Sequence, residues 1–81
     1  MSNFDAFGEN GKRFATKAAL RRAVQAGENV RFVDTTAFGG RGTVTAEDLD
    51  PGDVIIGPNP YERREWYANV KSTRNGSLRV V

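Results

Sequence analysis

The chain has 81 residues, of which 38% are hydrophobic and 27% charged, and its formal net charge is +2. These values exclude a disordered polyelectrolyte, and the length leaves room for one small core and no second one. The sequence contains neither cysteine nor histidine, which removes disulfides, the usual zinc ligands and the commonest general base near neutral pH, so we expect a non-enzymatic protein without a cofactor.

Hydropathy gives no sign of a membrane segment. No apolar run approaches the ~18 residues that a membrane-spanning helix needs, and the first residues lack the apolar core of a secretory signal. We therefore expect no contact with a membrane and, by default, a cytoplasmic protein.

Residues 1–13 show no helical or strand periodicity. Phe4 and Phe7 stand in polar surroundings, and each is expected to dock either on the rest of the chain or on a partner. The sequence therefore predicts a flexible N-terminal arm over residues 1–13 and a single domain over residues 14–81.

A helix is predicted over Lys17 to Ala26. Thr16 is a favourable N-cap, and Gly27 stands where a left-handed C-cap residue belongs. Apolar side chains gather on one side of this helix at helical spacing, namely Ala19, Leu20, Ala23 and Val24. The other side is basic and consists of Lys17, Arg21 and Gln25. Taken alone, such a face is most simply a solvated exterior.

A strand is predicted over Val30 to Asp34, with Val30 and Phe32 on one face. The segment that follows, TTAFGGRG over residues 35–42, matches neither of the glycine motifs that bind phosphates. It is therefore expected to be a flexible loop.

The segment over residues 45–53 is acidic. Thr45 and Asp48 have the spacing of a capping box, which predicts one helical turn over Ala46 to Leu49. Four acids gather here without a base, namely Glu47, Asp48, Asp50 and Asp53. Because Pro51 occupies a position where a calcium-binding loop has a ligand, a solvated acidic turn is expected instead of a metal site.

A second strand is predicted over Val54 to Gly57. It follows the phrase LDPGDVI, which resembles the strand-opening turn of small β domains, including those of self-splicing and signal-processing enzymes. Those enzymes need a nucleophile with a base, and with cysteine and histidine absent only the structural interpretation remains. Pro58 and Pro60 cannot donate to a strand ladder, so Gly57 to Arg64 is expected to be a connecting loop.

The dipeptide Asn75-Gly76 predicts a terminal β-hairpin. A two-residue turn would pair Val70 with Val81, whereas a three-residue loop over residues 74–76 would pair Val70 with Val80. The second register is preferred because it gathers the apolar side chains on one face, namely Trp66, Ala68, Val70, Leu78 and Val80.

These elements predict an α+β domain. One helix is expected to pack on a small antiparallel sheet of three to five strands that ends in the C-terminal β-hairpin. Trp66, Leu20 and Phe32 each lie on the apolar face of their own element, so they are expected to share its single core.

Two basic surfaces are candidate binding sites. In the preferred register, Lys71 and Arg79 oppose each other on the outer face of the hairpin, on the strand face that also carries an aromatic ring. An aromatic ring beside cations is a common way to hold single-stranded nucleic acid, although an ordinary solvated face explains the same pattern. The candidate residues are Tyr67, Asn69, Lys71 and Arg79 on the hairpin and Lys17 and Arg21 on the helix.

Two stretches of the sequence, ENVRFVDTTAFG and GPNPYERREWYANV, resemble segments of small uncharacterised proteins from actinobacterial phages. The resemblance extends over about residues 14–71 and implies an accessory protein that contacts a host protein in the host cytoplasm. It assigns no catalytic or binding residues. The leading hypothesis is therefore a small protein-binding domain, and the alternative is a nucleic-acid-binding module that uses one of the two basic surfaces.

Overall fold

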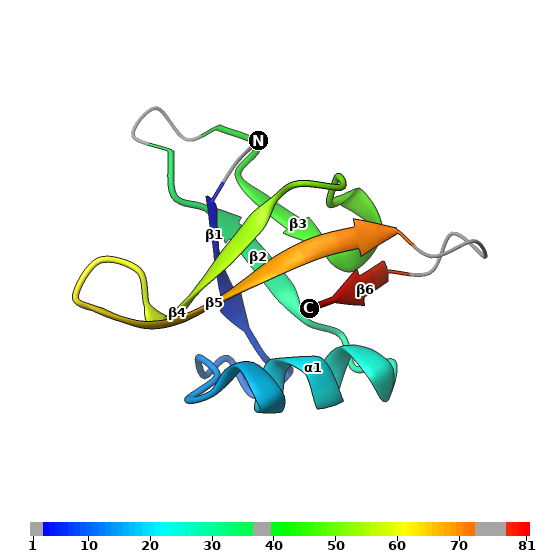
Figure 1. Ribbon diagram of the computed structural model, residues 1–81, viewed down its shortest axis with the longest axis horizontal. Helices are drawn as coiled ribbons and strands as arrows, with labels where there is room; N and C mark the ends of the chain where they lie inside the picture. The colour runs from blue at the N-terminus through cyan, green and yellow to red at the C-terminus, as the bar shows by residue number, and fades with distance from the viewer. Residues whose placement is uncertain (1–2, 37–39, 73–77) are drawn as a thin grey trace.

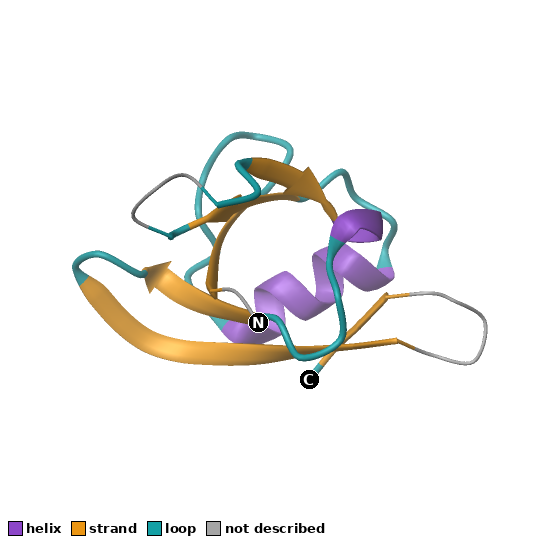
Figure 2. Ribbon diagram, turned by 90° about the horizontal axis from the view of Figure 1, so that it is seen from above, coloured by secondary structure: helices purple, strands orange, loops and turns teal. Residues whose placement is uncertain are grey.

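The helix and strands follow one another along the part of the chain that the computed structural model describes, residues 3–36, 40–72 and 78–81. In chain order these elements are β1 (Asn3–Phe7), α1 (Lys17–Gln25), β2 (Arg31–Asp34), β3 (Thr43–Thr45), the 3-10 turn η1 (Ala46–Asp48), β4 (Val54–Asn59), β5 (Arg63–Ser72) and β6 (Leu78–Val80). The strands form one sheet in the order β3-β2-β1-β4-β5-β6. This sheet curls into a half-barrel, and α1 lies along one of its ends (Figures 1 and 2).

The predicted fold class is wrong. In place of a helix on an antiparallel sheet of three to five strands, the described chain forms a six-stranded mixed sheet with one short helix. The sheet consists of two antiparallel halves, β3-β2-β1 and β4-β5-β6, which join where β1 runs parallel to β4. The strands absent from the prediction are β1 and β3, and β1 is the one that makes the sheet mixed.

The first described residues do not form a flexible arm. β1 lies inside the sheet, where Phe4 is opposite Asp34 of β2 on one side and Ile55 of β4 on the other. Phe4 and Ala6 are buried, so the phenylalanine docks on its own domain. Burial of that ring in the middle of the sheet is what holds the N-terminal residues in place.

The structure confirms the helix prediction. The Thr16 hydroxyl accepts a hydrogen bond of 3.1 Å from the Ala19 backbone, and Gly27 has a φ of 76°, which only glycine adopts without strain. Leu20 and Ala23 are buried under the sheet. The helix therefore presents its apolar side to the core and leaves Arg21 exposed.

The segment 57–64 is not a loop throughout. β4 continues to Asn59 and β5 already begins at Arg63, so only residues 60–62 connect them. Pro58 fits inside β4 because the pairing register with β5 shifts between Gly57 and Pro58. At such an irregularity the ladder is interrupted, and a residue without an N–H is tolerated.

The preferred hairpin register is confirmed. Val70 pairs with Val80 and Lys71 pairs with Arg79. The turn itself, residues 74–76, lies outside the described residues, as does the side chain of Leu78. The predicted helical turn is also present as η1, in which the Asp48 carboxylate accepts hydrogen bonds from the backbone and the hydroxyl of Thr45.

One core fills the curled sheet. Leu20 and Phe32 are fully buried in it, and Trp66 is half-buried and packs against it, in agreement with the prediction that these three side chains meet. The buried members are Phe4, Ala6, Leu20, Ala23, Val30, Phe32, Leu49, Ile55, Ala68, Val70 and Val80. They come from both halves of the sheet and from α1, so each half depends on the other for its burial.

Candidate functional site

The outer face of β5 and β6 carries the predicted hairpin residues. Tyr67, Asn69 and Lys71 alternate along β5 and all are exposed, and Arg79 lies opposite Lys71 on β6. The Tyr67 side chain is one of the two large exposed hydrophobic side chains among the described residues, with 64% of its surface accessible. The alternation of a strand thus places an aromatic ring and two cations on one wet face.

The helix and the hairpin meet at Tyr67. The ammonium of Lys17, in the first turn of α1, lies 5.9 Å from the centre of the Tyr67 ring. Arg21 is exposed one turn further along the helix. We call the set formed by Lys17, Tyr67, Asn69, Lys71 and Arg79 the basic surface. The contact between Lys17 and Tyr67 therefore joins the first turn of α1 to the outer face of β5.

The two cations of the hairpin face each other without an acid between them. Every aspartate and glutamate of the sequence lies among the described residues, and none of them forms an ion pair with Lys71 or Arg79. Like charges directly opposite each other on neighbouring strands are destabilising by a few tenths of a kcal/mol. This arrangement becomes favourable only when an anionic group is placed beside it.

A pocket of about 450 Å³ adjoins Tyr67 on the β4–β5 hairpin. Its lining consists of Val54, Ile56, Arg64, Glu65, Trp66 and Tyr67. The charged groups near it are already paired, since Arg63 forms a 2.8 Å ion pair with Glu65 and Arg64 donates to the carbonyl of Pro60. The hollow beside the basic surface is therefore largely apolar.

The indole of Trp66 lies directly on the backbone of Gly57. A Cβ at position 57 would lie less than 3.0 Å from three atoms of the ring, Cζ2, Cε2 and Cη2. We expect Gly57→Ala to destabilise the domain by about 1–3 kcal/mol, because the ring must be displaced from a packed position. The loss is measured as a shift of the urea midpoint.

A double-mutant cycle separates this clash from a backbone effect. In a Trp66→Leu background, where the ring is gone, Gly57→Ala should cost clearly less than in the parent chain. Equal losses in both backgrounds would show that Gly57 is needed for its conformation and not for contact with Trp66.

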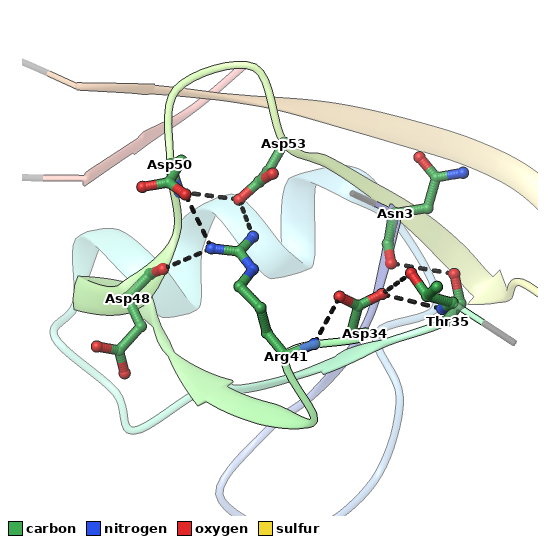
Figure 3. Close-up of polar contacts among 8 residues, drawn as sticks. Asn3, Asp34, Thr35, Arg41, Asp48, Asp50 and Asp53 are labelled. Atoms are coloured by element: carbon green, nitrogen blue, oxygen red, sulfur yellow. Dashed lines mark hydrogen bonds and ion pairs between the residues drawn. The ribbon is translucent and has the colours of Figure 1, made fainter. Parts of the chain in front are cut away.

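A second cluster, which the sequence analysis missed, is built around Arg41. Its guanidinium donates to the carboxylates of Asp50 and Asp53 and to the carbonyl of Asp48 (Figure 3). The same guanidinium lies 4.9 Å from the centre of the Phe4 ring. The acidic turn is therefore not simply solvated, since Asp53 is only 2% exposed. The hydrogen bond to Asp53 raises the pKa of Arg41 above its usual value.

Asp34 anchors the other side of the same loop. Its carboxylate accepts from the hydroxyl of Thr36 and from the backbone N–H groups of Thr36 and Arg41, which lowers the pKa of Asp34 to about 2. The glycine-rich segment was expected to be a flexible loop. Instead, these hydrogen bonds to Asp34 fix Thr36 and Arg41 in place. Residues 37–39 lie outside the described part of the chain. The sequence did contain a signal for this cluster. Arg41 has no acid beside it in the sequence, and the acidic turn that follows has no base, so the two could have been expected to pair.

Asp5 is the third buried carboxylate. It is 2% exposed on β1, and the Arg13 guanidinium pairs with one of its oxygens at 2.8 Å. Burial raises the pKa of Asp5 in spite of this partner. Its other oxygen has no hydrogen-bond partner among the described residues. The pair ties the segment before α1 to the sheet.

The groups of the basic surface and of the Arg41 cluster can form ion pairs, hydrogen bonds and contacts with aromatic rings. Among the described residues, no group of three or more acidic side chains is arranged to hold a metal ion. Within the same ranges, no helix has the length and apolar character needed to cross a membrane. The Arg41 cluster is internally satisfied and serves the fold, which leaves the basic surface as the candidate site.

Comparisons with known proteins add no assignment. No family model, curated protein or solved structure matches the chain. The resemblance to small actinobacterial phage proteins therefore stays a prediction from the sequence.

Proposed function

We propose that this chain is a small non-catalytic binding protein that uses the basic surface to hold an acidic patch of a partner protein. The observation that carries the proposal is the opposition of Lys71 and Arg79 without an acidic partner, on the strand face that also carries the exposed ring of Tyr67. An exposed aromatic with a charged rim is typical of energetically important contacts between proteins. The resemblance to phage accessory proteins is the reason to search for this partner among the proteins of a bacterial host.

Charge reversal on the hairpin tests this proposal. We expect Lys71→Glu with Arg79 unchanged to leave stability equal or slightly higher, because repulsion across the strands becomes attraction. The double variant Lys71→Glu/Arg79→Glu should lose the acidic partner in affinity capture from nuclease-treated host lysate. Thermal melting and capture are measured on the same preparations.

A matched control is available in the same chain. Lys12 and Arg31 are exposed and form no ion pair with a described acid, and Arg31 lies on β2, which β1 and β4 separate from β5 in the sheet. The variant Lys12→Glu/Arg31→Glu makes the same change of net charge and should keep the partner. Equal loss in both double variants would show that net charge alone governs binding and would contradict a defined surface.

Nucleic acid is the second candidate, and one contact favours it. The Lys17 ammonium beside the exposed Tyr67 ring is the combination of a cation and a stacking platform that holds single strands. In that case the Lys71→Glu/Arg79→Glu variant should weaken binding of a fluorescent oligonucleotide of any sequence. Binding by the parent chain should then fall steeply with rising salt.

A further inference from the structure

The turn between β4 and β5 presents an aromatic ring beside an acid. Tyr61 is 67% exposed and is, with Tyr67, one of the two large exposed hydrophobic side chains among the described residues. The neighbouring Glu62 carboxylate accepts a 3.5 Å hydrogen bond from Asn59 but forms no ion pair with a described base. Figures 1 and 2 show that this turn projects from the rest of the molecule. The ring and the carboxylate are therefore available to a neighbouring molecule.

The apolar pocket lies on the same hairpin, on the face that carries the basic surface. Ile55 is fully buried, so its neighbours Val54 and Ile56 point away from the core. Ile56 pairs with Tyr67 and Val54 pairs with Asn69, and paired residues share one face of a sheet. The aliphatic part of the pocket and the exposed Tyr67 ring therefore form one continuous outer surface.

Arg64 gives this pocket a positive wall. Its Nε donates to the carbonyl of Pro60, whereas its two terminal nitrogens have no partner among the described residues. Glu65 also lines the pocket, but Arg63 pairs with it at 2.8 Å and offsets its charge. A side chain that enters the pocket therefore meets apolar groups beside a guanidinium that can still bind a carboxylate.

We propose that two copies of this chain pair through these hairpins, with the Tyr61 ring of each copy in the pocket of the other and its Glu62 carboxylate on Arg64 of the other copy. The apolar ring matches the apolar lining, and the unpaired acid matches the unpaired nitrogens of the arginine. Each Tyr61 ring also meets a Tyr67 ring, and pairs of aromatic rings attract each other beyond the area that they bury. The inference goes beyond the proposed function and does not depend on it.

A two-fold axis beside residue 63 generates all of these contacts together. Positions equally far from the axis on its two sides face each other, so position 62 falls opposite position 64 of the other copy, and position 61 opposite position 65. The lining of the pocket includes residues 64–67. One rotation therefore brings both rings to both pockets, and the assembly closes as a dimer instead of growing into a filament.

This dimer should be weak and reversible. The contact is confined to the two hairpins, which places its area at the low end of protein interfaces, where association is transient. Arg63 would lie near its counterpart at the axis, and its own ion pair with Glu65 limits the repulsion. Because Tyr67 belongs both to the pocket and to the basic surface, an acidic partner bound there should compete with the dimer.

Sedimentation velocity of the full chain, from micromolar to millimolar concentration, tests the pairing. We expect the weight-average sedimentation coefficient to rise with concentration. Tyr61→Ala should raise the Kd of the dimer about tenfold or more, because two aromatic contacts are lost at once. Tyr61→Phe, which keeps the ring, should associate as the parent chain does. Thermal melting of each variant verifies that it folds.

Exchanging the charges tests the contact between Glu62 and Arg64. Glu62→Arg and Arg64→Glu should each weaken self-association, because both symmetric contacts become repulsive. An equimolar mixture of these two variants should form a heterodimer with about the parent affinity, since both contacts are then again between opposite charges. Lys12→Glu makes the same change of net charge as Arg64→Glu on a distant part of the sequence and should associate as the parent chain does.

The contradicting results are distinct. A parent chain that stays monomeric over the whole range, or an unchanged Kd in Tyr61→Ala, would overturn the pairing of hairpins. A mixture of the charge variants that associates no better than either alone would overturn the contact between Glu62 and Arg64. The basic surface as the site for an acidic partner would stand after any of these results, because its own test is partner capture by Lys71→Glu/Arg79→Glu.

Discussion

Phe4→Ala is expected to destabilise the domain by about 3–5 kcal/mol, enough to leave most of the chain unfolded at physiological temperature. The ring is fully buried on the strand that joins the two halves of the sheet, and the Arg41 guanidinium lies against it. Removing it opens a cavity at the centre of the sheet and withdraws the support of that guanidinium. The measurement is the midpoint and slope of urea unfolding followed by tryptophan fluorescence.

Phe7→Ala is the matched control, because Phe7 is only half-buried at the end of the same strand, with Arg13 over its ring at 4.8 Å. Its loss should be clearly smaller than that of Phe4→Ala. A chain that lacks residues 1–13 and still unfolds with the parent midpoint would show that these residues are an arm after all.

Arg41→Ala should cost about 2–4 kcal/mol, somewhat below the full penalty for breaking a buried ion pair because the Arg41 side chain is one-third exposed. Without the guanidinium, the buried carboxylate of Asp53 loses a charged partner, and the turn over residues 48–53 loses its link to the loop before β3. Thermal melting gives the loss directly. Arg31→Ala, which removes an exposed arginine of β2, should leave the melting temperature nearly unchanged.

A second substitution identifies the cause of that loss. Asp53→Asn in the Arg41→Ala background should recover part of the stability, because the amide carries no charge that needs compensation. If the double variant is less stable than Arg41→Ala, the loss comes from packing of the guanidinium on Phe4 and not from the removal of a positive charge beside Asp53.

Local signals in the sequence were sufficient for the helix and the hairpin. The helix has a cap at each end and an apolar side at helical spacing, and its bounds were predicted to within one residue. The hairpin register followed from the requirement that Val70 and Val80 share a buried face. In both cases the deciding interactions join residues close together in the chain.

β1 and the Arg41 cluster could not be predicted in the same way. In β1 the alternation of apolar and polar residues is confined to Phe4, Asp5 and Ala6. All three are buried, because the strand lies in the interior of the sheet and Arg13 pairs with the Asp5 carboxylate. Nothing within the first residues indicates a parallel partner some 50 positions away. Likewise, the role of Arg41 depends on its hydrogen bond to Asp53, and the two side chains meet only when the acidic turn has folded.

The sequence by itself determined the helix, the hairpin register and which hairpin side chains face water, namely Tyr67, Asn69, Lys71 and Arg79. It did so because side-chain alternation and helical spacing are properties of the backbone that do not depend on distant residues. Only the tertiary structure decided that β1 lies between β2 and β4, that Lys17 meets Tyr67, and that Arg41 reaches Asp53. These features depend on which strand pairs with which, and pairing is settled by burial of the whole core and not by any one segment.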